Sequence, residues 1–338
     1  MRKKLIVILI AMLALVGCGK KSESGLPDKV RIGIIRVPND KTVAISQDYF
    51  KAFFDEKGIK TEFMFFDSGV AANQAFSSGS IDFAEMGHTN GVVALANGLP
   101  VELIWIHEVL GTNEALVVKE GSDINAIADL EGKKIATTFS STSHLSLLKA
   151  LESEGIADKV QLLDMQTAEI VAAWERGDIE AAYSWEPGLS RLKETGTVLV
   201  DSEQLAKQGI ITANIDLVHK NFSEKYPELV ADYIRALDQA VTLYKTDAPT
   251  AITAAAAQLD ISDEEATQQM AGTIWLNAQE QISEDYLGTV EKPGNFHEVF
   301  YQTGEFLKDQ GNITEVPDIE SVNSFINSKY VELALGDN

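Results

Sequence analysis

The chain has 338 residues and a formal net charge of −23, with 51 acidic residues against 28 basic ones. This charge disfavours nucleic acid as a partner, because binding to phosphates requires a basic surface. Hydrophobic residues make up 45% of the chain and charged residues 23%, an ordinary globular composition with enough length for one large domain or two lobes.

The first residues predict a signal for export. Residues 2–4 are basic, and residues 5–16 form an apolar run that is too short to span a bilayer. The run ends in Leu-Val-Gly-Cys, which resembles a lipobox, and this resemblance implies that Cys18 is lipidated and becomes the mature N-terminus. An ordinary signal peptide that contains a cysteine is the alternative. We expect a lipoprotein signal peptide at 1–17 and anchoring to the outer face of the cell membrane through Cys18.

Cys18 is also the only cysteine in the sequence. The mature domain therefore has no disulfide, no cysteine metal site and no cysteine nucleophile. Residues 18–28 are polar and contain glycine and serine, which is typical of a flexible tether. No later segment has the apolar length of a membrane span, so we expect contact with the membrane through the lipid anchor only.

Two segments of the chain follow the same order of predicted elements. The strands of the first segment are expected at 30–35, 62–66 and 81–84. Those of the second segment are expected at 134–138, 160–163 and 179–182. Helices follow the strands in both segments, and similar turns precede the third strands, within SSGSIDFA and ERGDIEAA. Alternating strands and helices predict parallel strands with crossover helices, and the repeat predicts two α/β lobes.

Two further predicted strands, 115–119 and 215–219, carry the chain from one lobe to the other and back. The residues after 222 have mainly helical periodicity. We therefore predict an α/β fold with two lobes: two mixed, mostly parallel sheets with flanking helices, two crossover hinge strands and a helical C-terminal region. The expected boundaries are 29–114 for the first part of lobe 1, 115–214 for lobe 2 with its crossover strand, and 215–338 for the return to lobe 1 and the C-terminal helices.

The chain resembles taurine and alkanesulfonate substrate-binding proteins of ABC importers in the stretches DLEGKKIATTFSSTSHLSLLKALESEGI, AAWERGDIEAAYSWEPGLSRLKETGTVLVDS, FDSG and TNEALVVK. The resemblance covers most of residues 30–222 and lies nearer the taurine branch. It implies a two-lobed periplasmic-binding-protein fold of type II, with no cofactor, that captures a small sulfonate, taurine by preference, outside the membrane and delivers it to a permease. Related proteins bind nitrate, pyrimidines and other small molecules, so another small anion, a zwitterion or a pyrimidine-like compound is the alternative ligand.

Four hydroxyl side chains follow one another in the second segment, at Ser140, Ser141, Thr142 and Ser143, and His144 comes next. They lie where a strand leads into a helix, which is where sheets of this kind bind ligands. Backbone N–H groups at a helix N-terminus favour an anion, and hydroxyls add donors without charge. We predict that these five residues, called the serine loop below, bind the sulfonate. The alternative is a helix cap with spare serines, in which His144 merely caps the turn.

Trp185 and Glu186 form a second cluster, after the predicted strand 179–182. A Trp in a cleft offers an apolar face to an alkyl chain and a π-face to an ammonium group, and Glu186 can pair with that ammonium group. Glu114 and Asn214 flank the two crossovers at the expected floor of the cleft, and Glu114 is a second candidate partner for an ammonium group. Taurine-branch proteins often have an aspartate at the position of Asn214, so a charge is lost here. The alternatives are a Trp packed in the core, a solvated Glu186 and a hinge salt bridge at Glu114.

In lobe 1, the loops at strand ends offer Ser68, Gly69, Thr89 and Asn90 as ligand contacts. Gly69 would allow the backbone to approach a ligand closely. The five histidines of the chain are scattered, without the spacing of a metal site. We therefore predict no metal.

These observations favour a monomeric binding protein that closes its lobes around a ligand. An enzyme is the alternative, because pyrimidine-synthesis proteins share this fold. No nucleophile and base are paired at a strand end, and Ser143 and His144 are neighbours in sequence, which does not build a catalytic triad. We therefore predict no catalytic residues.

Overall fold

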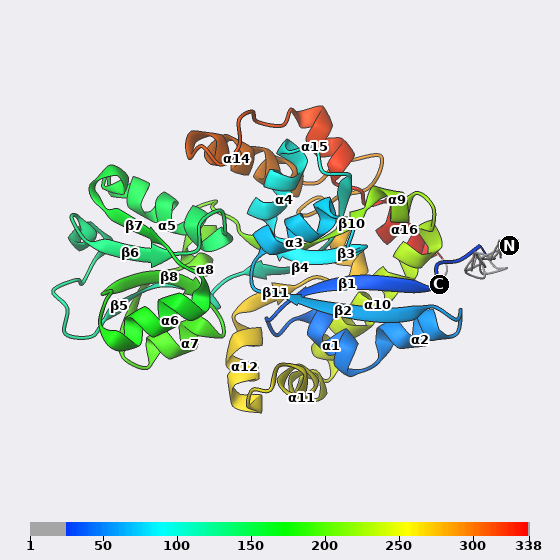
Figure 1. The fold of residues 1–338 in the computed structure, drawn as a ribbon, viewed down its shortest axis with the longest axis horizontal. Helices are drawn as coiled ribbons and strands as arrows, with labels where there is room; N and C mark the ends of the chain where they lie inside the picture. Colours follow the sequence, from blue (N-terminus) through cyan, green and yellow to red (C-terminus); the bar gives the residue numbers. More distant parts are fainter. Residues whose placement is uncertain (1–24, 337–338) are drawn as a thin grey trace, which may run out of the picture.

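The computed structural model describes residues 25–336. Cys18, the predicted signal peptide and most of the predicted tether lie outside the described residues. Within residues 25–336, no helix is long and apolar enough to cross a membrane. Figure 1 shows two lobes side by side, each built on one sheet with helices on both of its faces.

The larger sheet has six strands in the order β11-β4-β10-β3-β1-β2. Its strands are β1 (Lys29–Ile35), β2 (Lys60–Phe66), β3 (Phe83–Gly87), β4 (Val101–Leu110), β10 (Ala213–His219) and β11 (Thr273–Trp275). All ten residues of β4 are buried. A strand can be buried along its whole length only when both faces of its sheet are covered, as they are here.

The smaller sheet has five strands in the order β7-β6-β8-β5-β9. Its strands are β5 (Glu114–Lys119), β6 (Lys134–Thr137), β7 (Gln161–Asp164), β8 (Ala181–Trp185) and β9 (Gly196–Asp201). The chain passes from the larger sheet to the smaller one between β4 and β5, and it returns between β9 and β10. The two predicted crossover strands are thus β5 and β10.

Both sheets are mixed, as predicted, but parallel pairs do not predominate. The parallel pairs are β1–β2, β1–β3, β6–β7 and β6–β8, whereas β5 and β10 run antiparallel to both of their neighbours. The reason is the crossover itself. Strands that lead into helices end at the space between the lobes, while β5 and β10 begin there and run away from it. The expectation of mostly parallel sheets was therefore too strong.

Short helices connect the strands within each lobe. In the larger lobe they are α1 (Asp40–Ser46), α2 (Tyr49–Asp55), α3 (Gly69–Ser77) and α4 (His88–Ala96). In the smaller lobe they are α5 (Thr142–Ser153), α6 (Thr167–Arg176), α7 (Gly188–Lys193) and α8 (Ser202–Ala206), with 3₁₀ turns at Ile127–Leu130 and Ala157–Lys159. The helix α6 ends at Gly177, whose φ of 80° is a left-handed conformation that a residue with a Cβ adopts only at a cost.

The C-terminal region is helical, as predicted. Its elements besides β10 and β11 are α9 (Lys220–Ser223), α10 (Pro227–Thr246), α11 (Ala248–Leu259), α12 (Asp263–Ala271), α13 (Ala278–Gln281), α14 (Phe296–Asp309), α15 (Ile319–Phe325) and α16 (Lys329–Gly336). The helices α10 and α11 pack against α1, and α14 packs against α4. In Figure 1 these helices cover the larger lobe from both sides, and the end of α14 points toward the smaller lobe.

The hydrophobic core follows the two-residue period of the strands. Along β5, Leu116 and Val118 join the large core that continues through the larger lobe, whereas Ala115 and Val117 face a second layer with Trp174. Trp174 is almost fully buried. Replacing it by Ala would leave a cavity in that layer and cost about 3–5 kcal/mol.

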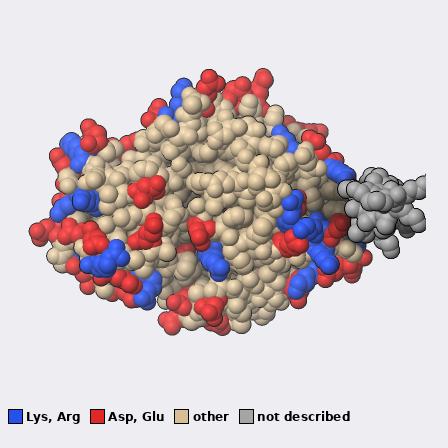
Figure 2. All heavy atoms as spheres, in the orientation of Figure 1, with Lys and Arg blue, Asp and Glu red and all other residues tan. Residues whose placement is uncertain are grey.

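Charged side chains are unevenly distributed over the face shown in Figure 2. On this face they lie mainly toward the two ends and along the upper and lower edges, with acidic and basic groups mixed. The central part of that face is largely uncharged.

Candidate functional site

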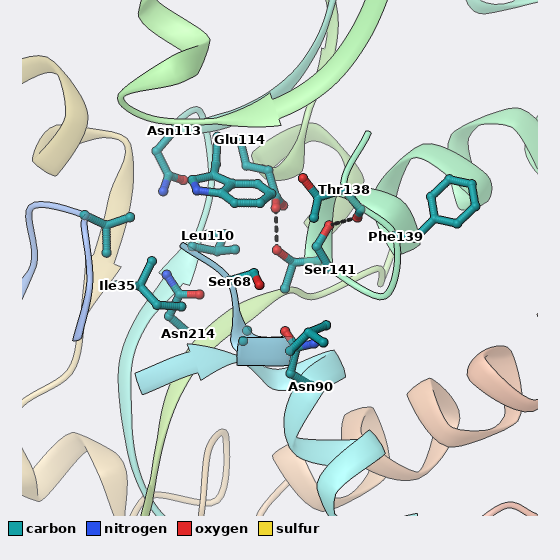
Figure 3. A pocket seen from close by; sticks show the side chains of 16 residues that line it. Ile35, Ser68, Asn90, Leu110, Asn113, Glu114, Thr138, Phe139, Ser141 and Asn214 are labelled. Carbon is teal, nitrogen blue, oxygen red and sulfur yellow. Dashed lines mark hydrogen bonds between the residues drawn. The ribbon is translucent and has the colours of Figure 1, made fainter. Parts of the chain in front are cut away.

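A cleft lies between the two lobes, at the ends of the strands (Figure 3). It encloses about 540 Å³ of space, including its open mouth. The predicted ligand residues at its surface are Ser68, Gly69, Asn90, Glu114, Ser141, Thr142, Trp185 and Asn214. The predicted residues that do not line it are Thr89, Ser140, Ser143, His144 and Glu186. Both lobes and both crossovers thus contribute to one site.

Further residues at the cleft surface were not predicted as ligand contacts, among them Ile35, Leu110, Asn113 and Phe139. Asn113 immediately precedes Glu114 and its side-chain oxygen accepts from the N–H of Gly111. Its position next to a predicted site residue, at a crossover, was the signal available in the sequence. The apolar residues carried no such signal, because a strand-end Ile or Leu is ordinarily part of the core.

Glu114, the first residue of β5, is a fully buried carboxylate. Its Oε1 accepts from the hydroxyls of Thr142 and Ser143, and its Oε2 accepts from those of Ser202 and Thr212. Burial raises the pKa of Glu114, and the four hydroxyl groups oppose that rise because they stabilise the charged form. Within the described part of the chain, no basic side chain pairs with this carboxylate.

The serine loop uses its hydroxyls inside the protein. Ser141 is the N-cap of α5: its Oγ accepts from the N–H of His144 at 3.2 Å and donates to the carbonyl oxygen of Thr138. Thr142 and Ser143 donate to Glu114. Within residues 25–336, the backbone N–H groups of Thr142 and Ser143 have no hydrogen-bond partner. They belong to the first turn of α5 and point out of its N-terminus.

Ser140 joins the two lobes. Its carbonyl oxygen accepts from Thr89 Oγ1 at 2.9 Å and from Asn90 Nδ2 at 3.2 Å, both on α4 of the larger lobe. Its hydroxyl oxygen accepts from Asn312 Nδ2 at 2.9 Å, just beyond α14. Ser140 has a φ of 61°, a left-handed conformation that costs a non-glycine residue roughly 1 kcal/mol or more. Ser140 and Thr89 therefore form an interlobe contact beside the cleft.

His144 is a buried packing residue. Its ring stacks on Phe139 with 4.5 Å between centroids and meets the edge of Phe306 from α14. Its Nδ1 accepts from the N–H of Ser140 at 3.3 Å. Burial lowers the pKa of His144 to about 4, so the ring is neutral at pH 7. These contacts match the capping alternative for His144.

The N-terminus of α3 faces the cleft from the larger lobe. Ser68 is its N-cap, and its Oγ accepts from the N–H of Ala71. Only glycine fits at position 69, because an added Cβ would lie 2.3 Å from Asn90 Oδ1. The N–H groups of Gly69 and Val70 have no partner within residues 25–336, as expected for the first turn of a helix.

Trp185 and Glu186 have different surroundings. Trp185 lines the cleft, and its indole N–H has no partner among the described residues. Glu186 is 3% exposed and accepts from the N–H of Ser190 and from Lys193 Nζ, each at 2.8 Å. Its charge is therefore compensated within α7, by the helix N-terminus and by a lysine.

Asn214 lines the cleft at the start of β10, and its Nδ2 donates to Glu108 Oε1 at 2.5 Å. Behind this pair lies a fully buried group of charges, in which His107 Nδ1 bonds Asp40 at 2.6 Å and Lys41 Nζ lies 2.8 Å from Asp216. Burial alone would lower the pKa of His107, but the charge of Asp40 and the hydrogen bonds with both aspartates raise it to about 10. This group therefore contains cations as well as acids, unlike the surroundings of Glu114.

The cleft thus presents two kinds of polar group. The N-termini of α3 and α5 supply N–H donors, and Glu114 supplies a buried carboxylate. No cluster of three or more His, Cys, Asp or Glu side chains in residues 25–336 is arranged to hold a metal ion.

The model of the family described as NMT1/THI5 like matches residues 43–251 of this chain. The chain is 33% identical to the taurine-binding periplasmic protein of Escherichia coli (strain K12), over 83% of this chain and 86% of that protein. The chain belongs to the NMT1/THI5-like family. The predicted resemblance is thereby confirmed.

Two solved structures show the same fold as this NMT1/THI5-like chain. The alkanesulfonate-binding protein SsuA from Xanthomonas axonopodis pv. citri, bound to MOPS, has a TM-score of 0.71 at 20% identity, covering 90% of this chain and 98% of that one. The periplasmic aliphatic sulphonate binding protein SsuA from Escherichia coli has a TM-score of 0.71 at 21% identity, covering 88% and 92%. The two-lobed periplasmic-binding-protein fold is confirmed. The relatives named above are binding proteins, and the prediction that the chain is not an enzyme is confirmed as well.

Proposed function

We propose that this protein binds taurine, or a similar small sulfonate with an ammonium group, in the interlobe cleft and delivers it to an ABC permease. The observation that carries the proposal is Glu114, a fully buried carboxylate at the cleft surface whose hydrogen-bond partners are all uncharged hydroxyls. A buried charge without a counter-ion is costly, and a ligand ammonium group would offset that cost. The relative named for taurine, and the two structures named for alkanesulfonates, support a sulfonate as the other end of the ligand.

The sulfonate is proposed to lie between the N-termini of α3 and α5. These helices belong to different lobes, and both leave first-turn N–H groups unpaired within residues 25–336, at Gly69 and Val70 and at Thr142 and Ser143. A sulfonate is ionised at every physiological pH, so it requires donors and no proton acceptor. The positive end of a helix dipole suits that charge.

The ammonium group is proposed to lie near Glu114 and the amide oxygen of Asn214. Glu186 is not part of the proposed site, because Lys193 and the N–H of Ser190 already compensate its charge. Trp185 would cover the short carbon chain with its ring, and its indole N–H is a further donor for the sulfonate.

Closure of the lobes is the proposed mechanism. In this proposal residues 29–114 and 215–338 form lobe 1, residues 115–214 form lobe 2, and the connections before β5 and β10 act as hinges. The bonds from Thr89, Asn90 and Asn312 to Ser140 support a closed state, because they cross between the lobes.

The protein is proposed to act as an exported monomer, held at the outer face of the membrane by a lipid on Cys18. The sequence around Cys18 supports this, since a basic stretch, an apolar run and a small residue precede the cysteine.

Isothermal titration calorimetry with taurine and ethanesulfonate tests the proposed function. The two compounds differ only in the ammonium group. Taurine should bind at least about tenfold more tightly, or roughly 1.4 kcal/mol, because ethanesulfonate leaves the carboxylate of Glu114 without a counter-ion. Equal or tighter binding of ethanesulfonate would favour a general alkanesulfonate site. Binding of neither compound would favour another small anion, zwitterion or pyrimidine-like ligand.

A further inference from the structure

Glu108 lies directly behind a residue of the cleft. Glu108 in β4 and Asn214 in β10 are cross-strand partners, and Asn214 Nδ2 donates to Glu108 Oε1 at 2.5 Å. Glu108 is 2% exposed, and within the described part of the chain its second oxygen, Oε2, is buried without a hydrogen-bond partner. Buried polar atoms are nearly always paired, so the unpaired oxygen needs an explanation.

The protonation of Glu108 decides which way the amide of Asn214 can face. An ionised carboxylate only accepts hydrogen bonds, so it requires the NH₂ group of Asn214 and leaves the amide oxygen facing away from it. Figure 3 shows this arrangement, with the oxygen of Asn214 on the side of Ser68. A proton on Oε1, the oxygen that faces Asn214, would make that oxygen a donor, and the amide could then turn over and present NH₂ to the cleft. An amide oxygen attracts an ammonium group, and an NH₂ group does not.

Several charged groups face Glu108 from the neighbouring elements. They are Glu85 on β3, His107 on β4 itself and Asp40 on α1, with Lys41 and Asp216 one layer further into the same buried group. Burial and the nearby charge of Glu85 raise the pKa of Glu108 to about 8, and His107 opposes this rise. Both protonation states of Glu108 are therefore accessible close to neutral pH.

We propose that Glu108 is a positioning residue: it holds the amide oxygen of Asn214 toward the cleft, and the pair thereby gives the site part of its preference for ligands with an ammonium group. This inference rests on the proposed function and assigns its specificity to a residue that does not touch the ligand. The negative charge of Glu108 lies one strand away from the cleft and acts on the ligand through the side-chain amide of Asn214.

The first test is Glu108→Gln, measured by calorimetry with taurine and ethanesulfonate from pH 6 to pH 8. A glutamine can donate or accept, so it no longer fixes the amide of Asn214. The dissociation constant of ethanesulfonate divided by that of taurine should fall by about fivefold or more. In the unchanged protein, taurine affinity should rise by about fivefold or more over this pH range, because only the ionised form of Glu108 is competent. Glu108→Gln should remove that rise.

Glu102→Gln is the matched control. Glu102 is also a buried glutamate of β4, but it lies at the far end of the strand, where it accepts from Ser223, Asn327 and Tyr330. This change should lower the melting temperature and leave the ratio and the pH profile unaltered. A purely structural role of Glu108 would make the two variants behave alike.

The exchange E108Q/N214D keeps the proposal testable even if Glu108→Gln folds poorly. It places the carboxylate at the cleft and the amide behind it, so one hydrogen bond of the pair is preserved. The preference for taurine should return to the original ratio or exceed it.

The outcomes separate this inference from the proposed function. If the unchanged protein prefers taurine but Glu108→Gln keeps the same ratio and pH profile, Glu108 does not position Asn214, while the proposed function stands. In that case Glu85 or Glu114 causes the pH dependence. An exchanged protein that binds both compounds equally also contradicts the inference. If the unchanged protein binds neither compound, the proposed function and the inference both fail.

Discussion

The carbonyl oxygen of Ser140 accepts a hydrogen bond from the side-chain amide of Asn90, 3.2 Å away, and so connects the serine loop with α4 on the opposite side of the cleft. The hydroxyl oxygen of Ser140 accepts from Asn312 as well, outside the cleft itself. Three bonds between the lobes thus meet at one residue with a left-handed backbone conformation. This contact can change the affinity for a ligand without touching it, because it stabilises only the closed arrangement.

Asn312→Ala tests this contact. The loss of one hydrogen bond should favour the open lobes by about 0.5–1.5 kcal/mol and weaken taurine binding by roughly twofold to tenfold. Calorimetry gives the affinity, and small-angle X-ray scattering gives the compactness of the free protein. Gln310→Ala is the matched control, since Gln310 is exposed two residues away. An unchanged affinity for Asn312→Ala would show that the contact does not contribute to closure.

Glu114→Gln should separate taurine from ethanesulfonate. Removing the charge should weaken taurine binding by about tenfold or more, while ethanesulfonate binding stays the same or improves, because no buried charge is then left without a counter-ion. Glu186→Gln serves as the control: Glu186 is just as buried, but its partners are Lys193 and the N–H of Ser190. We expect it to lower the melting temperature and leave taurine affinity intact. Loss of affinity in the control alone would move the ammonium site to Glu186.

Ser141→Ala and Thr142→Ala should have different effects. Ser141 caps α5, so its change should cost about 1 kcal/mol of unfolding free energy, or roughly 2 °C in melting temperature. Thr142 donates to Glu114, so its change should mainly weaken ligand binding. Thermal unfolding and calorimetry on both variants measure the two effects. If Ser141→Ala melted like the unchanged protein and bound less ligand, the hydroxyl of Ser141 would be a ligand contact instead of a cap.

The buried group around His107 should make stability depend on pH. The folded pKa of His107 is about 10, raised against burial by Asp40 and Asp216, and an unfolded histidine has a pKa of about 6.5. Its stabilising contribution is therefore complete below about pH 6.5 and is lost as the pH rises through about 10. His107→Gln should remove this pH dependence and cost about 3 kcal/mol or more at pH 6. Urea unfolding at pH 6, 8 and 10 measures both. If the free energy of unfolding of His107→Gln changed with pH as it does in the unchanged protein, other groups would cause the pH dependence.

Cys18→Ser tests the proposed lipid anchor. Without the thiol the protein cannot be lipidated, so it should be lost in part from the membrane fraction and be found in the medium. Mass spectrometry of the unchanged protein should find a lipid on Cys18. An N-terminus without lipid would leave an ordinary signal peptide as the explanation of residues 1–17.

The sequence by itself determined the order of the elements and the position of the cleft. Hydrophobic periodicity located the strands, and a strand that leads into a helix must end at the ligand side of such a sheet. For this reason Ser68, Gly69, Trp185 and the start of β5 at Glu114 could be assigned to one site before any contact was known. The N-cap role of Ser141 was also available as an alternative, because capping depends on residues only a few positions apart.

Only the tertiary structure decided which polar groups are paired. Glu186 and Glu114 looked alike in sequence, but Glu186 meets Lys193, whereas Glu114 meets four hydroxyls from three separate parts of the chain. Asn214 and Glu108 are 106 positions apart and meet through the register of β4 and β10. Local patterns specify an element and its exposed face, whereas the partner of a side chain depends on how distant strands align. That alignment arises from the packing of the whole core.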